Sequence, residues 1–221
     1  MPAWMRQIGA WPASPLTLLE ETLLGTRALL RGERLSAHGR HVQLDAVILE
    51  RPPAIEPLII AGVRSPKSLA VSGRCEDGTI LAEPVTPEYL SVARAQIGAR
   101  NAHHIVAYTF AAIDADVHLA RASVRPALLW VGEPDSLPHI APLPFAAELA
   151  ALRTRCTTPQ EFAAALPDAL VDQLAVISTP AAARVRIAQL HTAGANSVVQ
   201  IPVGPHPISA LNSLALLLPA A

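Results

Sequence analysis

The sequence predicts an α/β fold in which parallel strands are covered by helices. Short apolar runs of strand length alternate along the chain with longer stretches that space leucine, alanine and valine as helices do. Proline and glycine separate the two kinds of segment. The 221 residues, 51% of them hydrophobic, suffice for a sizeable core, so we expect residues 1–221 to form one domain.

The first expected elements precede any buried strand. Residues 15–31 carry leucines at helical spacing, with Pro15 at the first helical position and Gly32 as the stop. Residues 41–49 alternate between apolar and polar side chains, which predicts a strand or a small hairpin.

Four clear strands follow, each accompanied by helical patterns. The expected strands are residues 58–60, 79–83, 105–110 and 197–201. The expected helices are residues 66–74, 87–97, 114–131, 145–153, 159–176, 179–193 and 207–218. Four prolines make residues 132–145 an irregular insertion, and Gly194 fits a left-handed helix end.

Such strands could form either an open, doubly wound sheet or a closed barrel. The dinucleotide fingerprint with its three glycines is absent, which weakens a nicotinamide-binding interpretation. A β/α barrel needs eight strands, so four strands correspond to about half of one. The sequence therefore favours a partial barrel with a helical insertion before its last strand.

Composition excludes several classes of protein. The net charge of −1 gives no electrostatic case for nucleic acid or for an anionic membrane surface. The longest apolar runs are too short to span a bilayer. Cys75 and Cys156 lie far apart, and we expect free thiols in the cytoplasm. No His, Asp or Glu cluster has metal-ligand spacing, so no metal site is expected.

One turn stands out by its basic residues. Lys67 is the only lysine among 17 lysines and arginines, and it follows the apolar run 58–60. Ser65 and Pro66 predict a helix start, while Gly62 permits a tight turn. The free N–H groups of that start, with Arg64 and Lys67, would bind an anion. The alternative is an ordinary capped helix with two solvated cations.

Two further side chains are candidates for the same edge of the sheet. Glu83 ends the expected strand 79–83 and could act as an acid or base on a substrate, or be a loop carboxylate. Gln200, at the end of the last strand, could hydrogen-bond a cofactor or substrate, or be structural. His103 and His104 precede a strand at the opposite edge, where a structural role is expected.

Several segments together carry a family likeness. They are Trp-Met-x-Gln-Ile-Gly, Leu-Leu-Arg-Gly-Glu, Gly-Arg-His-Val-Gln-Leu-Asp, Pro-Leu-Ile-Ile-Ala-Gly-Val-Arg-Ser-Pro-Lys-Ser-Leu-Ala, Glu-Asp-Gly-Thr-Ile-Leu-Ala-Glu and Ala-Gly-Ala-Asn-Ser-Val-Val-Gln-Ile-Pro-Val-Gly, in that order. The chain resembles the luciferase-like flavin and deazaflavin oxidoreductases, and most of all the actinobacterial branch that uses coenzyme F420.

The resemblance implies a TIM barrel whose cofactor lies across the carboxyl ends of the strands. It implies that the turn after the fifth strand of the barrel holds the cofactor phosphate, and the matching residues here are Ala61, Gly62, Val63, Arg64, Ser65 and Lys67. It also implies deazaflavin F420, with FMN as the alternative, and an organic small molecule as substrate.

The chain departs from the family at its N-terminus. Family members carry a longer N-terminal part that forms the first four strands of the barrel. We therefore expect a truncated gene product, a second chain that supplies the other half, or a repurposed fold. Half a barrel leaves open strand edges and an open apolar interior, so a homo-oligomer or a complementary chain is expected.

Three functions follow from the resemblance. The first is an oxidoreductase that transfers hydride between reduced deazaflavin and an organic substrate. The second is a non-catalytic or repurposed member, such as a partner subunit. The third is an FMN-dependent monooxygenase.

Overall fold

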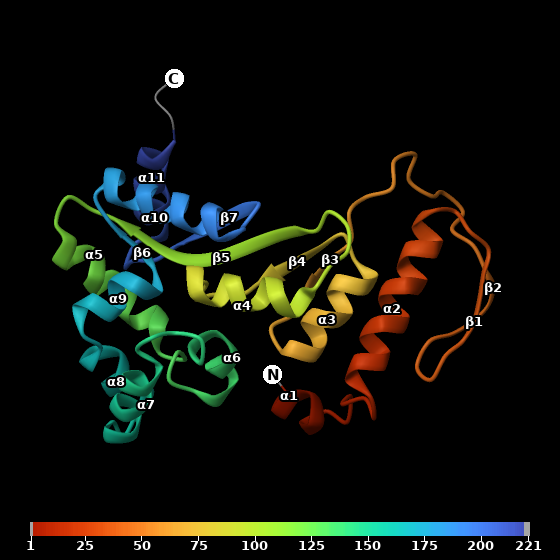
Figure 1. Ribbon diagram of the computed structural model, residues 1–221, viewed down its shortest axis with the longest axis horizontal. Helices are drawn as coiled ribbons and strands as arrows, with labels where there is room; N and C mark the ends of the chain where they lie inside the picture. The colour runs from red at the N-terminus through yellow and green to blue at the C-terminus, as the bar shows by residue number, and fades with distance from the viewer. Residues whose placement is uncertain (1, 219–221) are drawn as a thin grey trace. The chain divides into compact units, whose positions relative to one another are not determined.

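The computed structural model describes residues 2–218, which fall into two compact units. Unit 1 comprises the chain up to Thr79 together with Gln96–His104. Unit 2 comprises Ile80–Ala95 and the chain from Ile105 onward. Figure 1 shows the course of the chain and the labels of its elements. Within the described residues, no helix is long and apolar enough to cross a membrane.

Unit 1 begins with helices and a hairpin. Its elements are α1 (Pro2–Gln7), α2 (Pro15–Leu30), β1 (Leu35–His38), β2 (Gln43–Val47), β3 (Ile60–Gly62), α3 (Pro66–Cys75) and the start of β4 (Gly78–Leu81). The expected helix 15–31 is α2, and β1 and β2 form an antiparallel hairpin. The short helix α1 was not predicted.

A single carboxylate ties the hairpin to α2. Glu21 of α2 accepts hydrogen bonds from the backbone N–H groups of Arg40, His41 and Val42 at 2.7, 2.8 and 2.9 Å. These donors lower the pKa of the Glu21 carboxyl, because they stabilise its charged form. The hairpin position therefore depends on a side chain about twenty residues earlier, a link that periodicity alone does not predict.

The strand expected at residues 58–60 lies two residues later, at Ile60–Gly62. The Ile59 N–H donates to the Asp77 carboxylate at 2.9 Å, so it is not available to a strand ladder there. Leu58 is 65% exposed, although a buried strand residue was expected at this position. The helix that follows, α3, begins at Pro66 as predicted.

Unit 2 contains a sheet of parallel strands. Its elements are the rest of β4, α4 (Pro87–Ile97), β5 (His104–Ile113), α5 (Val117–Val124), α6 (Leu137–Ile140), α7 (Ala146–Arg155), α8 (Pro159–Ala165), α9 (Asp168–Leu174), β6 (Val176–Ser178), α10 (Pro180–Ala193), β7 (Ser197–Pro202) and α11 (Pro207–Leu214). In the sheet β4 neighbours β5, and β5 pairs in parallel with both β6 and β7. The expected α/β fold with a parallel sheet is confirmed.

Two predictions in unit 2 were wrong. The expected helix 159–176 is two helices, because the chain is extended at Leu166 and Pro167 between α8 and α9. Its end instead forms β6, a strand the four-strand prediction lacked, which pairs with Ala111–Ile113 of β5. Val176 and Ile177 are buried, and a short buried apolar run looks alike in a helix and in a strand.

The helix expected at residues 114–131 is also shorter than predicted. Asp116 caps α5 by accepting from the His118 N–H at 2.8 Å, which places the start at Val117. Pro126 has no N–H to donate, and the chain continues as a 3-10 turn over Arg125–Leu128. Farther along the chain, Gly194 ends α10 with a φ of 115°, the left-handed conformation that was expected there.

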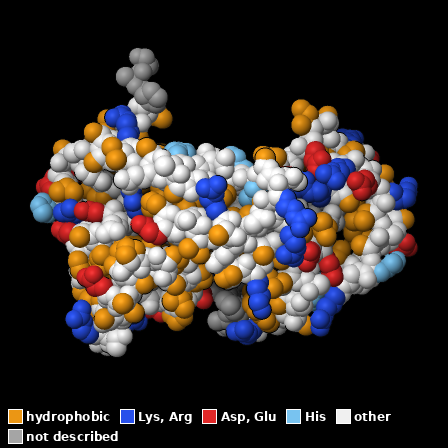
Figure 2. All heavy atoms as spheres, in the orientation of Figure 1, with side chains coloured by type: hydrophobic (Ala, Val, Ile, Leu, Met, Phe, Trp, Pro, Cys, Tyr) orange, Lys and Arg blue, Asp and Glu red, His pale blue; other side chains and the backbone are white. Residues whose placement is uncertain are grey.

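One hydrophobic core of unit 2 is built from its helices together with β5 and β6. Its buried side chains include Leu128, Leu149, Phe162, Val171 and Leu174, and the insertion adds Ile140, Leu143 and Phe145. Hydrophobic side chains also reach the surface over this region, as Figure 2 shows, with Trp130 65% and Leu137 62% exposed. The segment expected to be irregular, residues 132–145, consists of turns around one 3-10 turn at Pro134–Ser136 and the four-residue helix α6.

Candidate functional site

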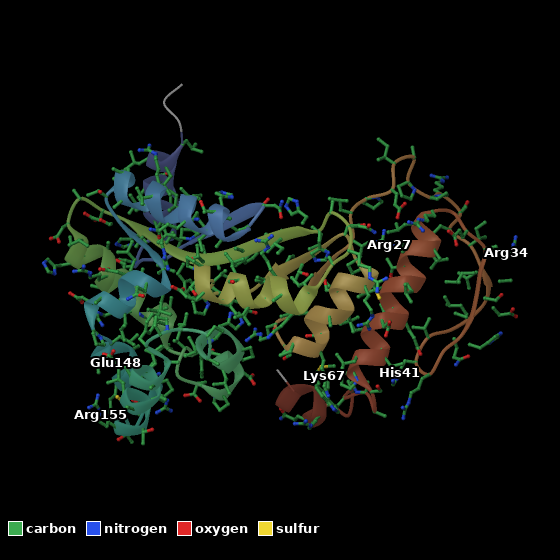
Figure 3. The ribbon with its side chains drawn as sticks, viewed as in Figure 1. Arg27, Arg34, His41, Lys67, Glu148 and Arg155 are labelled. Carbon is green, nitrogen blue, oxygen red and sulfur yellow. The ribbon has the colours of Figure 1, made fainter. Side chains whose placement is uncertain are left out.

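The basic turn of unit 1 is largely exposed to solvent. Ser65, Pro66 and Lys67 are exposed, Arg64 is half-buried, and Ala61 is buried at the end of β3. Figure 3 shows Lys67 at the beginning of α3. Ser65 occupies the N-cap position, but its side chain makes no capping hydrogen bond. The first-turn N–H groups of α3 have no partner within their own helix, and the Ser65 side chain does not supply one.

Gly62 was expected to permit a tight turn, but the turn does not need a glycine at this position. Its backbone is not in the left-handed region, so the turn does not demand glycine. A Cβ built at Gly62 would meet nothing within 4 Å. The space beside this residue is empty, and glycine leaves that space free for a ligand.

Glu83 lies in unit 2, just after β4. The strand ends at Leu81, so Glu83 belongs to the loop that leaves the sheet and not to the strand that was expected to include it. Glu83 is half-buried, the Glu83–Pro84 peptide bond is cis, and Pro84 is buried. The start of β4 lies beside the start of β5, because the His104 N–H donates to the Asp77 carbonyl at 2.7 Å. The loop carrying Glu83 therefore follows the carboxyl end of a parallel strand.

Gln200 is the candidate with the clearest physical anomaly. It lies on β7 opposite Thr109 of β5. Both polar atoms of its amide are buried, and neither has a hydrogen-bond partner among the described residues. A buried amide without partners costs free energy, so native proteins normally pair it. Gln200 thus offers one donor and one acceptor that the described chain does not use.

A small cavity at the carboxyl ends of β5 and β7 escaped sequence reasoning. Its volume is about 160 Å³, and its polar lining includes Asp114, Ser123, His206, Ser209 and Ser213. His206, in the segment Gly204-Pro205-His206-Pro207, looks from the sequence like an ordinary loop residue. The sequence feature that could have indicated this cavity is the spacing of Ser209 and Ser213. They lie one helical turn apart on α11, which places both on one face of the helix.

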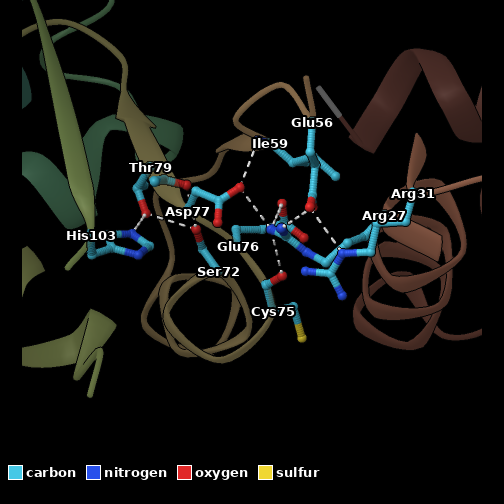
Figure 4. A network of polar contacts seen from close by, with 11 residues as sticks. Arg27, Arg31, Glu56, Ile59, Ser72, Cys75, Glu76, Asp77, Thr79 and His103 are labelled. Atoms are coloured by element: carbon cyan, nitrogen blue, oxygen red, sulfur yellow. Dashed lines mark hydrogen bonds and ion pairs between the residues drawn. The ribbon is translucent and has the colours of Figure 1, made fainter. Parts of the chain in front are cut away.

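A second, larger cavity lies in unit 1 at the amino ends of β4 and β5, away from the turn that precedes α3. It measures about 640 Å³ and is lined from α2, from the end of α3 and from the loop before β5. Figure 4 shows its polar network. Arg27 of α2 contacts Asp77 at 2.9 Å and Glu56 at 3.0 Å, and Arg31 contacts Glu56 at 3.0 Å. The network joins α2 to the loop before β4.

His103 has the structural role that was expected. Its Nε2 lies 2.8 Å from the Thr79 hydroxyl, which in turn lies 2.7 Å from the Ser72 hydroxyl. Ser72 also donates to the Gly78 carbonyl at 3.1 Å. Burial lowers the pKa of the His103 ring, because it disfavours the charged form of the imidazole.

Glu76 is the unusual member of this network. Its side chain is 0% exposed, its Oε2 lies 3.7 Å from Arg27 Nη2, and neither of its oxygens accepts a hydrogen bond within the described chain. Burial raises the pKa of its carboxyl to about 7, against the lowering effect of Arg27 and with a smaller contribution from Asp77. The folded protein therefore holds a proton here that the unfolded chain releases near its ordinary pKa of 4.5.

A pH dependence of stability follows from Glu76. Because the folded state binds the extra proton, this group makes the free energy of unfolding fall as pH rises from about 4.5 to about 7. Glu76→Gln should remove that fall, so the variant should match the wild type at pH 4.5 and exceed it at pH 8. Urea unfolding at several pH values measures the difference. Equal slopes in both proteins would contradict the assignment, and Glu88→Gln, an exposed carboxylate, is the control.

Within the described residues no group of three or more His, Cys, Asp and Glu side chains could hold a metal ion. Both cysteines are free thiols, as expected, and each is half-buried. Glu83 and Gln200 belong to unit 2, whereas the six residues of the basic turn belong to unit 1.

Comparisons with known proteins give the family. The profile of the luciferase-like monooxygenases matches residues 2–197. No curated protein matches the chain. Among solved structures, the coenzyme F420 dependent tetrahydromethanopterin reductase from Methanopyrus kandleri superposes with a TM-score of 0.70 at 20% identity, covering 91% of this chain and 62% of that one.

Two further structures agree on the fold. An F420-dependent secondary alcohol dehydrogenase has a TM-score of 0.69 at 15% identity, over 97% of this chain and 64% of that one. The monooxygenase RslO1 from Streptomyces bottropensis has a TM-score of 0.62 at 16% identity, over 98% and 63%. The chain thus spans less than two thirds of these structures, and the expected fold, part of a luciferase-like β/α barrel, is confirmed. With a family match over most of its length, the chain belongs to the luciferase-like monooxygenases.

Proposed function

We propose that this chain forms part of an oxidoreductase that transfers hydride between deazaflavin F420 and an organic small molecule. The observation that carries the proposal is the exposed turn before α3, where Lys67 lies at a helix start that has no side-chain cap and Gly62 has unfilled space beside it. Such a helix start suits a phosphate ester. Two of the similar structures are described as F420-dependent, which favours F420 over FMN.

The residues of the chain fit distinct parts of such a cofactor. Ala61, Gly62, Val63, Arg64, Ser65 and Lys67 would hold the phosphate by backbone N–H groups and charge. The buried donor and acceptor of Gln200 match the alternating N–H and C=O groups on the edge of a flavin-type ring. When bound, the deazaflavin supplies the hydride chemistry, and the protein orients it and excludes water.

Glu83 would serve the substrate and not the cofactor. Its half-buried carboxyl lies in a loop at the carboxyl end of β4, where β/α-barrel enzymes place their reactive side chains. There it would hold or accept the proton that accompanies hydride transfer to a carbonyl or from an alcohol.

Titration of the purified chain with F420 and separately with FMN, followed by fluorescence, tests the proposal. Tighter binding of F420 is expected. Tighter binding of FMN would replace the proposal by a flavin monooxygenase, for which the similarity to RslO1 is the supporting observation. No binding of either would favour the non-catalytic or repurposed member.

We also propose that residues 1–221 act as one partial-barrel domain that associates with a second copy or with a chain supplying the other strands. The supporting observation is β7, all six of whose residues are only half-buried, including Val198, Val199 and Ile201. Light scattering at micromolar concentration should give a mass of at least two chains. A well-folded monomer would overturn this prediction.

The place of the protein in the cell and its lineage belong to the proposal as well. The cytoplasm is our proposed location, and the two free thiols suit its reducing conditions. The actinobacterial F420 branch is our proposed lineage, supported by the segments that first indicated the family.

A further inference from the structure

A buried histidine connects the insertion of unit 2 with the loop that carries Glu83. His139 lies in α6 and is 1% exposed. A polar ring that is fully enclosed by a protein normally has defined partners. The partners of His139 come from a part of the chain far away in sequence, which makes the contact informative.

The first partner is a backbone carbonyl. His139 Nδ1 lies 3.1 Å from the Pro84 oxygen, and the two residues are 55 positions apart. A carbonyl oxygen only accepts, so the proton of this contact belongs to Nδ1, which donates it. Removing the donor would leave the carbonyl of a buried residue without this bond, a loss that buried polar groups seldom tolerate.

The second partner is an aromatic ring. The His139 imidazole lies against Tyr89, with ring centroids 4.2 Å apart and planes inclined by 33°. Tyr89 is 1% exposed, and its own N–H donates to the Thr86 hydroxyl at 3.2 Å. The loop after β4 is thus held at Pro84 by a hydrogen bond and at the start of α4 by ring packing.

These contacts affect Glu83 through Pro84, the residue that follows it. Glu83 precedes Pro84 directly, so fixing the Pro84 carbonyl restricts how the Glu83 backbone leaves β4. The half-buried Glu83 side chain is attached to that restricted backbone. A reactive group must be held within a fraction of an ångström, and its supporting contacts provide this.

We infer that His139 is a positioning residue that holds the Glu83 loop in the geometry needed for reaction, and that the helical insertion is therefore part of the site. The inference rests on the proposed role of Glu83 as the acid or base. It deepens that role, because it assigns the orientation of the carboxyl to a side chain outside the strands.

Three variants separate positioning from mere packing. His139→Phe keeps a ring against Tyr89 and removes the donor, whereas His139→Asn keeps a donor at the place of Nδ1. Ile140→Val, at a buried neighbour in the same helix, is the packing control, since such a change costs some stability without touching Pro84. Thermal unfolding of all three shows that they fold.

The first readout needs no activity. With ¹³C-carboxyl-labelled glutamate, the Glu83 signal is assigned by its loss in Glu83→Gln. At fixed pH the signal should move in His139→Phe, return toward the wild-type position in His139→Asn, and stay in place in Ile140→Val. An unmoved signal in His139→Phe, or an equal shift in Ile140→Val, would overturn the inference.

The second readout is deazaflavin turnover in a double-mutant cycle. His139→Phe should lower turnover about tenfold to a hundredfold when Glu83 is present and have little further effect in Glu83→Gln, because the two act as a unit. An equal loss in both backgrounds would refute positioning through Glu83. If Glu83→Gln alone leaves turnover unchanged, the proposed acid/base role of Glu83 fails, while the carboxyl signal still decides whether His139 positions the loop.

Discussion

Replacing Glu83 with glutamine should lower the turnover of the deazaflavin reaction by about 10²–10⁴-fold, the usual loss when a general acid or base is removed. Glutamine keeps the shape and the hydrogen-bonding reach of the side chain, so it deletes only the group that titrates. The residue is half-buried after β4, and Pro84 next to it is held by His139, so the loop should keep its course in the variant. The measurement is the rate of F420 reduction or reoxidation under saturating cofactor.

Cofactor affinity distinguishes this role from its alternatives. Because Glu83 makes no proposed phosphate contact, the dissociation constant for F420 should stay within about twofold, an energy below 1 kcal/mol. Glu88→Gln, on the exposed side of α4, should change neither quantity. Loss of cofactor binding together with turnover would show that Glu83 belongs to the cofactor site. If the isolated chain shows no turnover, the same pair of variants is compared in the assembled barrel.

Removing the charge of Lys67 should weaken F420 binding about tenfold or more, because a charge-assisted contact to phosphate is among the stronger hydrogen bonds. Lys67 is exposed at the open start of α3, so Lys67→Ala should leave the fold intact. Titration of the variant with F420 at low and at moderate salt measures the loss, and the difference from wild type should shrink as salt screens the charge.

Two controls accompany the Lys67 variant. Lys67→Arg keeps the positive charge and should retain most of the affinity. Arg100→Ala removes an exposed cation that lines the cavity at the amino ends of the strands, and it should leave F420 binding unchanged. An unaltered dissociation constant in Lys67→Ala would remove the turn from the cofactor site.

Much of the fold could be predicted because its signals are local. Proline marks the first residue of α2, α3, α4, α10 and α11, where its fixed φ and missing N–H are tolerated. Gly194 ends α10 because it adopts a conformation that other residues avoid. Helix α4 was predicted to the residue for these reasons, and the basic turn was recognised from Lys67 and the helix start alone.

Prediction from the sequence failed where a residue far away in sequence determined the local structure. Strand β6 exists because Val176–Ser178 pairs with the end of β5, and two apolar residues followed by a serine do not predict that pairing. The shift of β3 was set by the Asp77 carboxylate taking the Ile59 N–H. In both cases a partner elsewhere in the chain overrode the local pattern.

The sequence by itself determined the alternation of strands and helices, the family, and the start of α3 at the basic turn, since spacing and side-chain type within a few positions suffice for these. Only the tertiary structure decided the environment of the candidate residues. It left the Gln200 amide without a hydrogen-bond partner among residues 2–218, buried Glu76 beside Arg27, and placed His139 Nδ1 against the Pro84 carbonyl. Burial and pairing are properties of how distant segments meet in space, and they are what gives these side chains their chemistry.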